Sequence, residues 1–250
     1  MTQSSNLKAS KPAFAMAASN NLSEALVQPT TALALETVAI PASVFDRRPH
    51  PSALSAVKRL IDIAGALVGL IVLAIAFVPI AIAIKLDSPG PIFYSQTRYG
   101  LQGKPFQIWK FRSMVADADR LKSIVQNEAA GLIFKNEADP RITRVGRFLR
   151  KTSLDEFPQF WNVLSGDMSI VGTRPPTSDE VANYSDYHWR RLDVKPGLTG
   201  QWQVSGRSQI KDFEEIVSLD LQYQSRWTPV YDLQIIIRTV LVLLRGTGAC

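Results

Sequence analysis

The longest apolar stretch of the chain covers residues 63–84 and reads IAGALVGLIVLAIAFVPIAIAI, without a single charged residue. As a helix it would rise about 33 Å, close to the hydrocarbon thickness of a bilayer. A core helix of this length would normally show a polar face, so the pattern favours a membrane segment over a buried core helix.

Two membrane arrangements are compatible with this stretch. Pro79 removes one helical hydrogen bond and is expected to bend the helix. The bent segment either spans the bilayer, where proline is tolerated, or forms a re-entrant hairpin that enters and leaves on one face. Lys58 and Arg59 precede the stretch and Lys85 follows it, so the positive-inside rule does not choose between them. Physical reasoning alone favours the spanning helix.

The segments on either side of the apolar stretch are different in kind. Residues 1–56 are rich in Ala, Ser, Thr, Asn and Pro, which predicts a disordered polar tail with at most a short amphipathic helix around residues 22–27. Residues 87–114 contain two β-prone runs, IFYSQ and FQIWKF, joined by YGLQGK. Two glycines in that connection predict a β-hairpin.

Further along the chain, residues 115–130 have the composition of a polar helix. The segment DPRITRVGRFLRK, residues 139–151, places arginines three apart, which on a helix would line one stripe. Such a stripe is either a solvated face or, beside a bilayer, a surface for anionic lipid. Its members are Arg141, Arg144, Arg147 and Arg150.

The last apolar run, residues 232–244, is too short to span a bilayer and contains Arg238. It predicts an interfacial or core-packing helix.

Composition narrows the chemistry. The formal net charge of +6 suggests an anionic partner such as a lipid head group, a phosphorylated substrate or a nucleic acid. Cys250 is the only cysteine and there are two histidines, which excludes a disulfide framework and makes a cysteine-rich or histidine-rich zinc site improbable. Catalysis is left to carboxylates, arginines, lysines and hydroxyls.

The most notable carboxylates are the adjacent Asp155 and Glu156, within SLDEFPQFWNVLSGDM. Ser153 and Glu156 fit a capping box, a purely structural arrangement. With Asp155 as the N-cap instead, Pro158 would become the third helical residue, where no N–H is missed. A helix N-terminus also attracts anions, and an ionised carboxylate there can attack phosphorus or hold Mg²⁺. The residues alone leave capping and chemistry both open.

A competing carboxylate pair is Asp117 and Asp119, spaced as in many metal-binding glycosyltransferases. That motif belongs at the end of an apolar strand, whereas here it lies in polar, helix-prone sequence. We therefore regard it as the weaker candidate.

Several long motifs together resemble the bacterial sugar transferase family, the monotopic phosphoglycosyl transferases that start surface glycan assembly. The resemblance covers about residues 57–250. The motifs are KRLIDI, PIFYSQTRYGLQGKPFQIWKFRSM, DPRITRVGRFLRKTSLDEFPQFWNVLSGDMSIVGTRPP and KPGLTGQWQVSGR.

This resemblance implies transfer of a sugar 1-phosphate from a UDP-sugar to polyprenyl phosphate, with release of UMP. It implies that Asp155 is the nucleophile, that Glu156 binds Mg²⁺, and that Lys110 is an active-site lysine. Basic residues expected to bind the phosphates of the substrates are Arg112, Arg150 and Arg174. The sugar is left open between glucose, galactose and N-acetylated sugars.

The resemblance also implies a fold and a location. We expect a mostly α protein with a small antiparallel β element, monotopic on the cytoplasmic face of a bacterial inner membrane. Residues 57–86 would form a re-entrant membrane helix, which reverses the preference for spanning, and residues 87–250 a cytoplasmic catalytic domain with an interfacial C-terminal helix. Expected partners are the UDP-sugar, polyprenyl phosphate, membrane lipids and further glycosyltransferases of the pathway, and not a nucleic acid.

Two departures from the family pattern concern local geometry. The helix break reads Val78-Pro79 where the family has Ser-Pro, and Thr173 stands where proline is usual, next to Arg174.

The alternative function, from another class, is that of a non-catalytic, membrane-anchored basic protein that recruits glycan enzymes.

Overall fold

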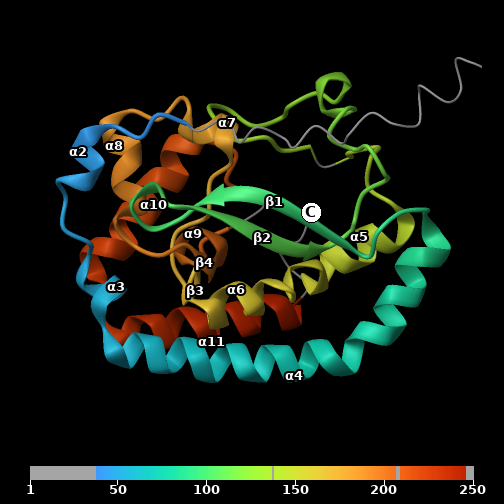
Figure 1. Cartoon of the computed structure of the whole chain (residues 1–250), viewed down its shortest axis with the longest axis horizontal. Coiled ribbons are helices and arrows are strands. Elements are labelled where there is room, and N and C mark those ends of the chain that lie inside the picture. Colours follow the sequence, from blue (N-terminus) through green and yellow to red (C-terminus); the bar gives the residue numbers. More distant parts are fainter. Residues whose placement is uncertain (1–37, 137, 207–208, 246–250) are drawn as a thin grey trace, which may run out of the picture. The chain divides into compact units, whose positions relative to one another are not determined.

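The computed structural model describes residues 38–136, 138–206 and 209–245 (Figure 1). The described part is mostly helical and includes an antiparallel β-hairpin, in agreement with the predicted fold class. The possible helix at residues 22–27 lies outside it.

Helix α4 (Ala56–Asp87) follows the apolar stretch, one residue longer at each end than the predicted 57–86. The Ser55 side chain caps its N-terminus by accepting a hydrogen bond from the Lys58 N–H. Pro79 lies inside the helix, and Figure 1 shows α4 running along the lower edge of the molecule before its last turns bend upward. The prediction of one long, bent apolar helix is confirmed.

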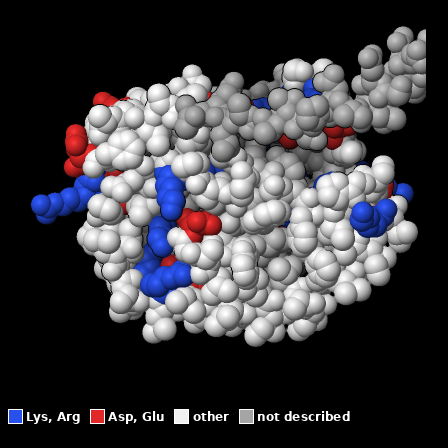
Figure 2. Space-filling model, viewed as in Figure 1, with Lys and Arg blue, Asp and Glu red and all other residues white. Residues whose placement is uncertain are grey.

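One face of α4 packs on the domain and the other does not. A Cβ on Gly69 would lie 2.4 Å from the Phe160 ring, so only glycine lets α4 approach helix α6 (Gln159–Ser165) this closely. In Figure 2 the lower edge, where Figure 1 places the middle of α4, is free of charged residues. The alternative of a buried core helix is therefore wrong. The apolar side chains of α4 that are more than half exposed are Val57, Leu60, Val68, Ile71, Ile75, Val78, Ile82 and Leu86.

The N-terminal end of α4 is fixed by a buried ion pair. Lys58 Nζ lies 2.7 Å from Asp232 Oδ2, on helix α11 (Pro229–Arg245). The same ammonium donates to the Val171 carbonyl of strand β3 (Ser169–Val171) and to the Tyr223 hydroxyl of helix α10 (Phe213–Arg226). One side chain thereby joins α4 to three other elements.

Two further polar contacts reinforce this end. Asp62 accepts hydrogen bonds from the Ser169 hydroxyl and the Ile170 N–H, both at 2.8 Å. The Arg59 guanidinium donates to the carbonyls of Val163 and Leu164 at the C-terminal end of α6. The polar first turns of α4 are thus held by β3 and α6.

The C-terminal end of α4 meets the predicted hairpin. Strands β1 (Phe93–Tyr99) and β2 (Pro105–Phe111) pair antiparallel across a short 3₁₀ turn, η1 (Leu101–Gly103), which confirms the hairpin. Phe77 of α4 stacks on Phe93, at 5.8 Å between ring centroids, and Phe93 stacks on Phe111 at 5.4 Å. Both ends of α4 are therefore bound to the same domain.

The polar helix predicted for residues 115–130 is not formed. Residues 116–121 make consecutive turns, and only η2 (Lys122–Ile124) is helical, as one 3₁₀ turn. Asp117 has φ +60°, and Arg141 Nη1 donates to the Ala118 carbonyl. A left-handed residue cannot continue a right-handed helix, and the Val115 N–H donates to the Arg141 carbonyl, so backbone groups of this segment bond to Arg141 and not within a helix.

The continuous arginine stripe is also wrong. Helix α5 (Arg144–Lys151) begins only at Arg144, where the Thr143 side chain caps it. Arg141 lies before the helix and forms a buried ion pair with Asp139, with Nη2 2.7 Å from Oδ2. Pairing with a nearby carboxylate removes this arginine from the exposed face.

Part of the predicted tail is folded. Residues 38–55, within the segment assigned to disorder, carry helices α2 (Ala42–Phe45) and α3 (Pro51–Leu54). Val44 is fully buried and packs in a cluster with Tyr99, Trp189 and Leu192. A few apolar residues are enough to pack this segment on the domain. The mostly polar composition of the segment therefore gave the wrong prediction for residues 38–55.

A second, parallel pair was not predicted. Strand β3 pairs with β4 (Gly197–Thr199). Around it lie short helices, and the connection between the strands contains the segment that carries Arg174. These elements are α7 (Ser178–Val181), α8 (Asp186–Trp189), η4 (Arg190–Asp193) and α9 (Gln201–Val204).

Helix α11 packs through Ile235, which is fully buried, and exposes much of its remaining apolar surface. The core-packing role is confirmed for the face that carries Ile235, and the interfacial role of the exposed face stays a prediction. The exposed apolar side chains are Val230, Leu233, Ile237, Val240, Leu241 and Leu243.

We expect Lys58→Met to destabilise the domain by about 3–5 kcal/mol, because it leaves the buried Asp232 carboxylate without its cation. Thermal unfolding in detergent micelles measures the loss. The matched control is Lys122→Met, which breaks an ion pair with Asp179 whose side chains are 46% and 73% exposed. That change should alter stability by less than about 1 kcal/mol. Equal effects of the two changes would contradict a special role for Lys58.

Candidate active site

Asp155 and Glu156 lie in a tight turn between two helices. They belong to η3 (Leu154–Glu156), a single 3₁₀ turn, and Ser153 before it adopts φ +56° in the left-handed region. The Ser153 side chain makes no capping hydrogen bond, and Pro158 is the residue that precedes α6. Both predicted cap registers are therefore wrong: the left-handed residue forces a separate turn, and α6 starts after the proline.

The position of this turn depends on how α5 meets the end of β2. A Cβ on Gly146 would lie 1.9 Å from the Ser113 carbonyl oxygen, so a side chain there would push α5 away. At this contact Arg150 Nε donates to the Ser113 hydroxyl at 2.9 Å. Arg150 is thereby held at the end of α5 that leads into the carboxylate turn.

The hairpin supplies the partner of Glu156. Lys110 Nζ, on β2, lies 2.9 Å from Glu156 Oε1, and both side chains are partly exposed. Asp155, one residue earlier, is only 6% exposed. Lys110 and Glu156 border a cavity of about 120 Å³. Its other lining residues are Arg98, Ile108, Gln159, Arg174, Pro175, Gly197, Leu198, Trp202 and Gln203.

Two arginines make one side of this cavity cationic. Arg174 Nη1 donates to both oxygens of the Glu180 carboxylate, at 3.0 and 2.8 Å. Arg98 donates to the Pro175 carbonyl and to the Gln96 side chain. Burial, together with the nearby Arg174, lowers the pKa of Arg98 to about 10, so both arginines are charged at neutral pH. Together with Lys110 they can bind phosphate oxygens.

Of the predicted site residues, the structure gathers Lys110, Glu156 and Arg174 at one cavity, with Asp155 in the adjoining turn. Arg112 does not line it. Its guanidinium donates instead to the carbonyls of Ser88 and Pro89, just beyond the end of α4. This contact gives Arg112 a structural role, and its substrate-binding role stays a prediction.

Sequence reasoning missed Arg98, Gln159, Trp202 and Gln203. Each lies inside a motif that carried the family resemblance, yet none belongs to a charged pair or a recognisable spacing. Arg98 sits on β1, so its distance from Arg174 depends on how the hairpin packs against the segment after β3. A prediction of that packing would have been needed to find it.

The competing pair Asp117 and Asp119 is exposed and lies in the turns that replace the predicted helix. No group of three or more His, Cys, Asp or Glu side chains suited to a metal occurs among the described residues. Mg²⁺ needs only one or two protein carboxylates when phosphate oxygens complete its coordination. The adjacent oxygen donors of Asp155 and Glu156, beside a cationic cavity, fit that requirement.

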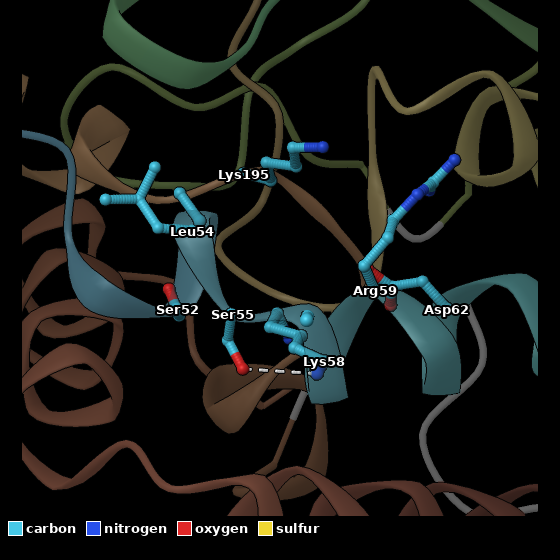
Figure 3. A pocket seen from close by; sticks show the side chains of 9 residues that line it. Ser52, Leu54, Ser55, Lys58, Arg59, Asp62 and Lys195 are labelled. Atoms are coloured by element: carbon cyan, nitrogen blue, oxygen red, sulfur yellow. Dashed lines mark hydrogen bonds between the residues drawn. The ribbon is translucent and has the colours of Figure 1, made fainter.

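A larger cavity, of about 400 Å³, lies at the start of α4 and shares no lining residue with the first (Figure 3). Lys58, Arg59 and Asp62 line it, and the hydrogen bonds described above already engage all three in holding α4. The polar side chains of Lys58, Arg59 and Asp62 therefore anchor helix α4.

The sequence matches a known protein family over most of its length. The family model for bacterial sugar transferases matches residues 53–246, which is most of the chain. The chain belongs to the bacterial sugar transferase family.

Within this bacterial sugar transferase family, the chain is similar to several curated proteins. It is 52% identical over 194 residues to the galactosyl transferase CpsE of Streptococcus agalactiae, covering 77% of this chain and 43% of that one. It is 43% identical over 198 residues to an undecaprenyl-phosphate galactose phosphotransferase of Salmonella typhimurium, covering 77% and 41%.

A third relative is the UDP-glucose:undecaprenyl-phosphate glucose-1-phosphate transferase of Escherichia coli, which is 40% identical over 202 residues, covering 76% of this chain and 42% of that one. The chain thus spans less than half the length of these three relatives. It covers 89% of a shorter one, the uncharacterized sugar transferase EpsL of Bacillus subtilis, at 37% identity.

In this member of the bacterial sugar transferase family, Gly146→Ala should destabilise the domain by about 1–3 kcal/mol, because the new methyl group meets the Ser113 backbone. Thermal unfolding in micelles gives the measurement. Gly100→Ala is the matched control, since its Cβ would meet only ordinary contacts at 3.4 Å and its φ is −110°. It should stay within about 0.5 kcal/mol of the parent. A silent Gly146→Ala would show that α5 can move without cost.

Proposed function

We propose that this chain transfers a sugar 1-phosphate from a UDP-sugar to polyprenyl phosphate, releasing UMP, as the first membrane step of surface glycan synthesis. The observation that carries the proposal is the single cavity bordered by Lys110, Glu156, Arg98 and Arg174, next to the buried Asp155. This cavity brings carboxylates together with the cationic side chains that bind a diphosphate. The names of the relatives, which include galactose and glucose phosphotransferases acting on undecaprenyl phosphate, support the same reaction.

The first step is attack by an Asp155 carboxylate oxygen on the phosphorus that carries the sugar. A bond forms between that oxygen and phosphorus, and the bond from phosphorus to the bridging oxygen of the diphosphate breaks. UMP leaves with the bridging oxygen and its electron pair. Lys110, Arg98 and Arg174 reduce the repulsion between the carboxylate and the diphosphate and stabilise the charge that develops on UMP.

The second step regenerates the carboxylate. An oxygen of polyprenyl phosphate attacks the phosphorus of the aspartyl phosphate, and the acyl phosphate bond breaks. The product is a polyprenyl diphosphate sugar, and no proton transfer is required because the attacking phosphate is already anionic. Asp155 is buried, which limits access of water that would otherwise hydrolyse the intermediate.

Glu156 would hold Mg²⁺, with phosphate oxygens as the remaining ligands. When bound, the ion neutralises charge on the diphosphate and so favours departure of UMP. In the absence of substrate, Lys110 balances the charge of Glu156 at 2.9 Å. Arg150, held beside Ser113 near the carboxylate turn, is proposed to bind a substrate phosphate as well.

We further propose that α4 is re-entrant and that the protein is monotopic on the cytoplasmic face of the inner membrane. The support is that both ends of α4 bind one domain, through Lys58 at the start and through Phe77 and Arg112 near the end. A spanning helix would separate its ends by about 30 Å of hydrocarbon. The exposed apolar faces of α4 and α11 would then enter the same leaflet.

The roles of the two carboxylates are separable. Asp155→Asn should abolish UMP release, since an amide cannot form the phosphoryl intermediate. Glu156→Gln should lower the rate and weaken the dependence on Mg²⁺, leaving a trace of activity. The measurement is UMP release by purified protein from a panel of UDP-sugars, with Mg²⁺ and with EDTA.

An intact-mass experiment tests the covalent step. The parent, given a UDP-sugar and Mg²⁺ without lipid acceptor, should gain the mass of one sugar phosphate on the peptide that contains Asp155. Asp155→Asn, with matched size, should gain nothing. UMP that appears only after polyprenyl phosphate is added, with no adduct to trap, would favour direct transfer and remove the nucleophile role.

Cysteine labelling in intact cells tests the membrane arrangement. With Cys250 replaced by serine, single cysteines at Asp46 and at Lys104 lie on exposed positions before and after α4. Both should resist a membrane-impermeant maleimide and both should react once the membrane is opened. Labelling of only one of them from outside would mean that α4 spans the bilayer.

A further inference from the structure

Three residues that line the cavity beside Glu156 each have a buried side-chain polar atom without a hydrogen-bond partner. These atoms are Nε2 of Gln159, Nε1 of Trp202 and Oε1 of Gln203. The Gln159 side chain is almost completely buried, at 3% exposed. Buried polar atoms without partners cost free energy and are rare in native proteins, so their presence calls for a physical reason.

Two of these three side chains, those of Gln159 and Trp202, differ from the other side chains with an unpartnered atom in the described part of the chain. There are seven such atoms in that part, and the remaining four belong to Arg47, Arg112, Asn136 and Asp220. Each of those four side chains is held through another of its polar atoms. By contrast, the indole N–H is the only polar group of the Trp202 side chain, and the side-chain amide of Gln159 makes no hydrogen bond within the described structure. Gln203 is held through its amide nitrogen, but all three unpartnered atoms belong to residues that line the cavity, and a ligand there can supply the missing hydrogen bonds.

The orientation of Gln203 is fixed by its own contact. Its amide nitrogen donates to the Leu198 carbonyl at 3.1 Å, which leaves the side-chain oxygen as the acceptor. The residues that line the cavity therefore carry two neutral donors without partners, on Gln159 and Trp202, and one neutral acceptor on Gln203. Neutral donors and acceptors match hydroxyl groups, which both donate and accept, whereas the cations of the same cavity match phosphate.

The position of the set points to one part of the substrate. Gln159 follows Glu156 by three residues and opens α6, directly after the carboxylate turn. In the proposed reaction, the phosphorus attacked by Asp155 carries the sugar. Groups close to the carboxylates therefore lie closer to the sugar than to the uracil ring, which departs with UMP.

We propose that Gln159, Trp202 and Gln203 bind hydroxyl groups of the transferred sugar and so decide which UDP-sugar is accepted. This inference rests on the proposed function. A site built to hydrogen-bond a hydroxyl rejects an analogue that lacks it, because the buried groups of the protein are then left unpaired. The three residues would discriminate among hexoses in that way.

The test measures UMP release by the full-length protein in micelles with Mg²⁺. The best UDP-sugar of a panel is compared with its analogues in which single sugar hydroxyls are replaced by hydrogen. Gln203→Met keeps the length of the side chain and removes the acceptor, and Trp202→Phe removes the indole donor. Each should lower kcat/KM for the best UDP-sugar by roughly 10-fold, with little loss for the analogue that lacks the hydroxyl it contacts.

Inhibition by UMP separates sugar from nucleotide. If the residues bind the sugar, the inhibition constant of UMP stays unchanged in both variants. A rise by the same factor as the loss in kcat/KM would assign them to the nucleotide and overturn the proposal. Gln107→Met, on the exposed face of β2, is the matched control and should behave as the parent.

The remaining outcomes are equally decisive. Thermal unfolding of each variant identifies one that fails to fold, and the two variants act on different atoms, so either can carry the test. Unchanged relative kcat/KM values across the sugars in folded variants would mean that these atoms bind only water. A parent protein that releases no UMP from any UDP-sugar would overturn the proposed function, and this inference with it.

Discussion

The buried ion pair between Lys58 and Asp232 is the contact on which the arrangement of the other elements depends. Burying a charge is costly unless it is paired, and both side chains here are almost inaccessible, at 6% and 1%. The Asp232 carboxylate also accepts hydrogen bonds from Tyr223 and Trp227. These contacts fix the positions of α4, α10, α11 and β3 relative to one another. Strand β3 leads into the segment that carries Arg174, so the same pair also orients one side of the cavity.

A second buried network of hydrogen bonds and ion pairs keeps the arginine side chains beside the cavity close together. Arg191 donates to Asp220 through Nε at 2.9 Å and Nη2 at 2.7 Å, and both side chains are 1% exposed. Burial tends to raise the pKa of Glu180, but Arg174, Arg98 and Arg191 outweigh it and leave that pKa lowered. An ionised Glu180 offsets the repulsion between the two arginines that border the cavity. This balance lets them stay close while still presenting positive charge to an anion.

In the proposed function, the apolar surface and the charged cavity act together. Helices α4 and α11 leave their outer faces exposed, and the polar contacts of α4 gather at its first turns and beyond its last one. On the proposed monotopic arrangement, the domain would receive a water-soluble nucleotide sugar and a lipid phosphate at the same cavity. The proposed two-step reaction requires that access, because its donor and acceptor come from different phases.

The sequence by itself determined the features that depend on neighbouring residues: the apolar helix with its bend at Pro79, the hairpin with its glycine turn, and the adjacent carboxylates. Periodicity and turn chemistry are local, so these could be predicted. The tertiary structure decided the rest. Residues 115–130 formed turns around the left-handed Asp117 and bonded to Arg141, which paired with Asp139 instead of joining an exposed stripe. Arg98, Gln159, Trp202 and Gln203 come from β1, α6 and α9, and only long-range packing brings them to one cavity, since no local pattern records which distant segments will meet.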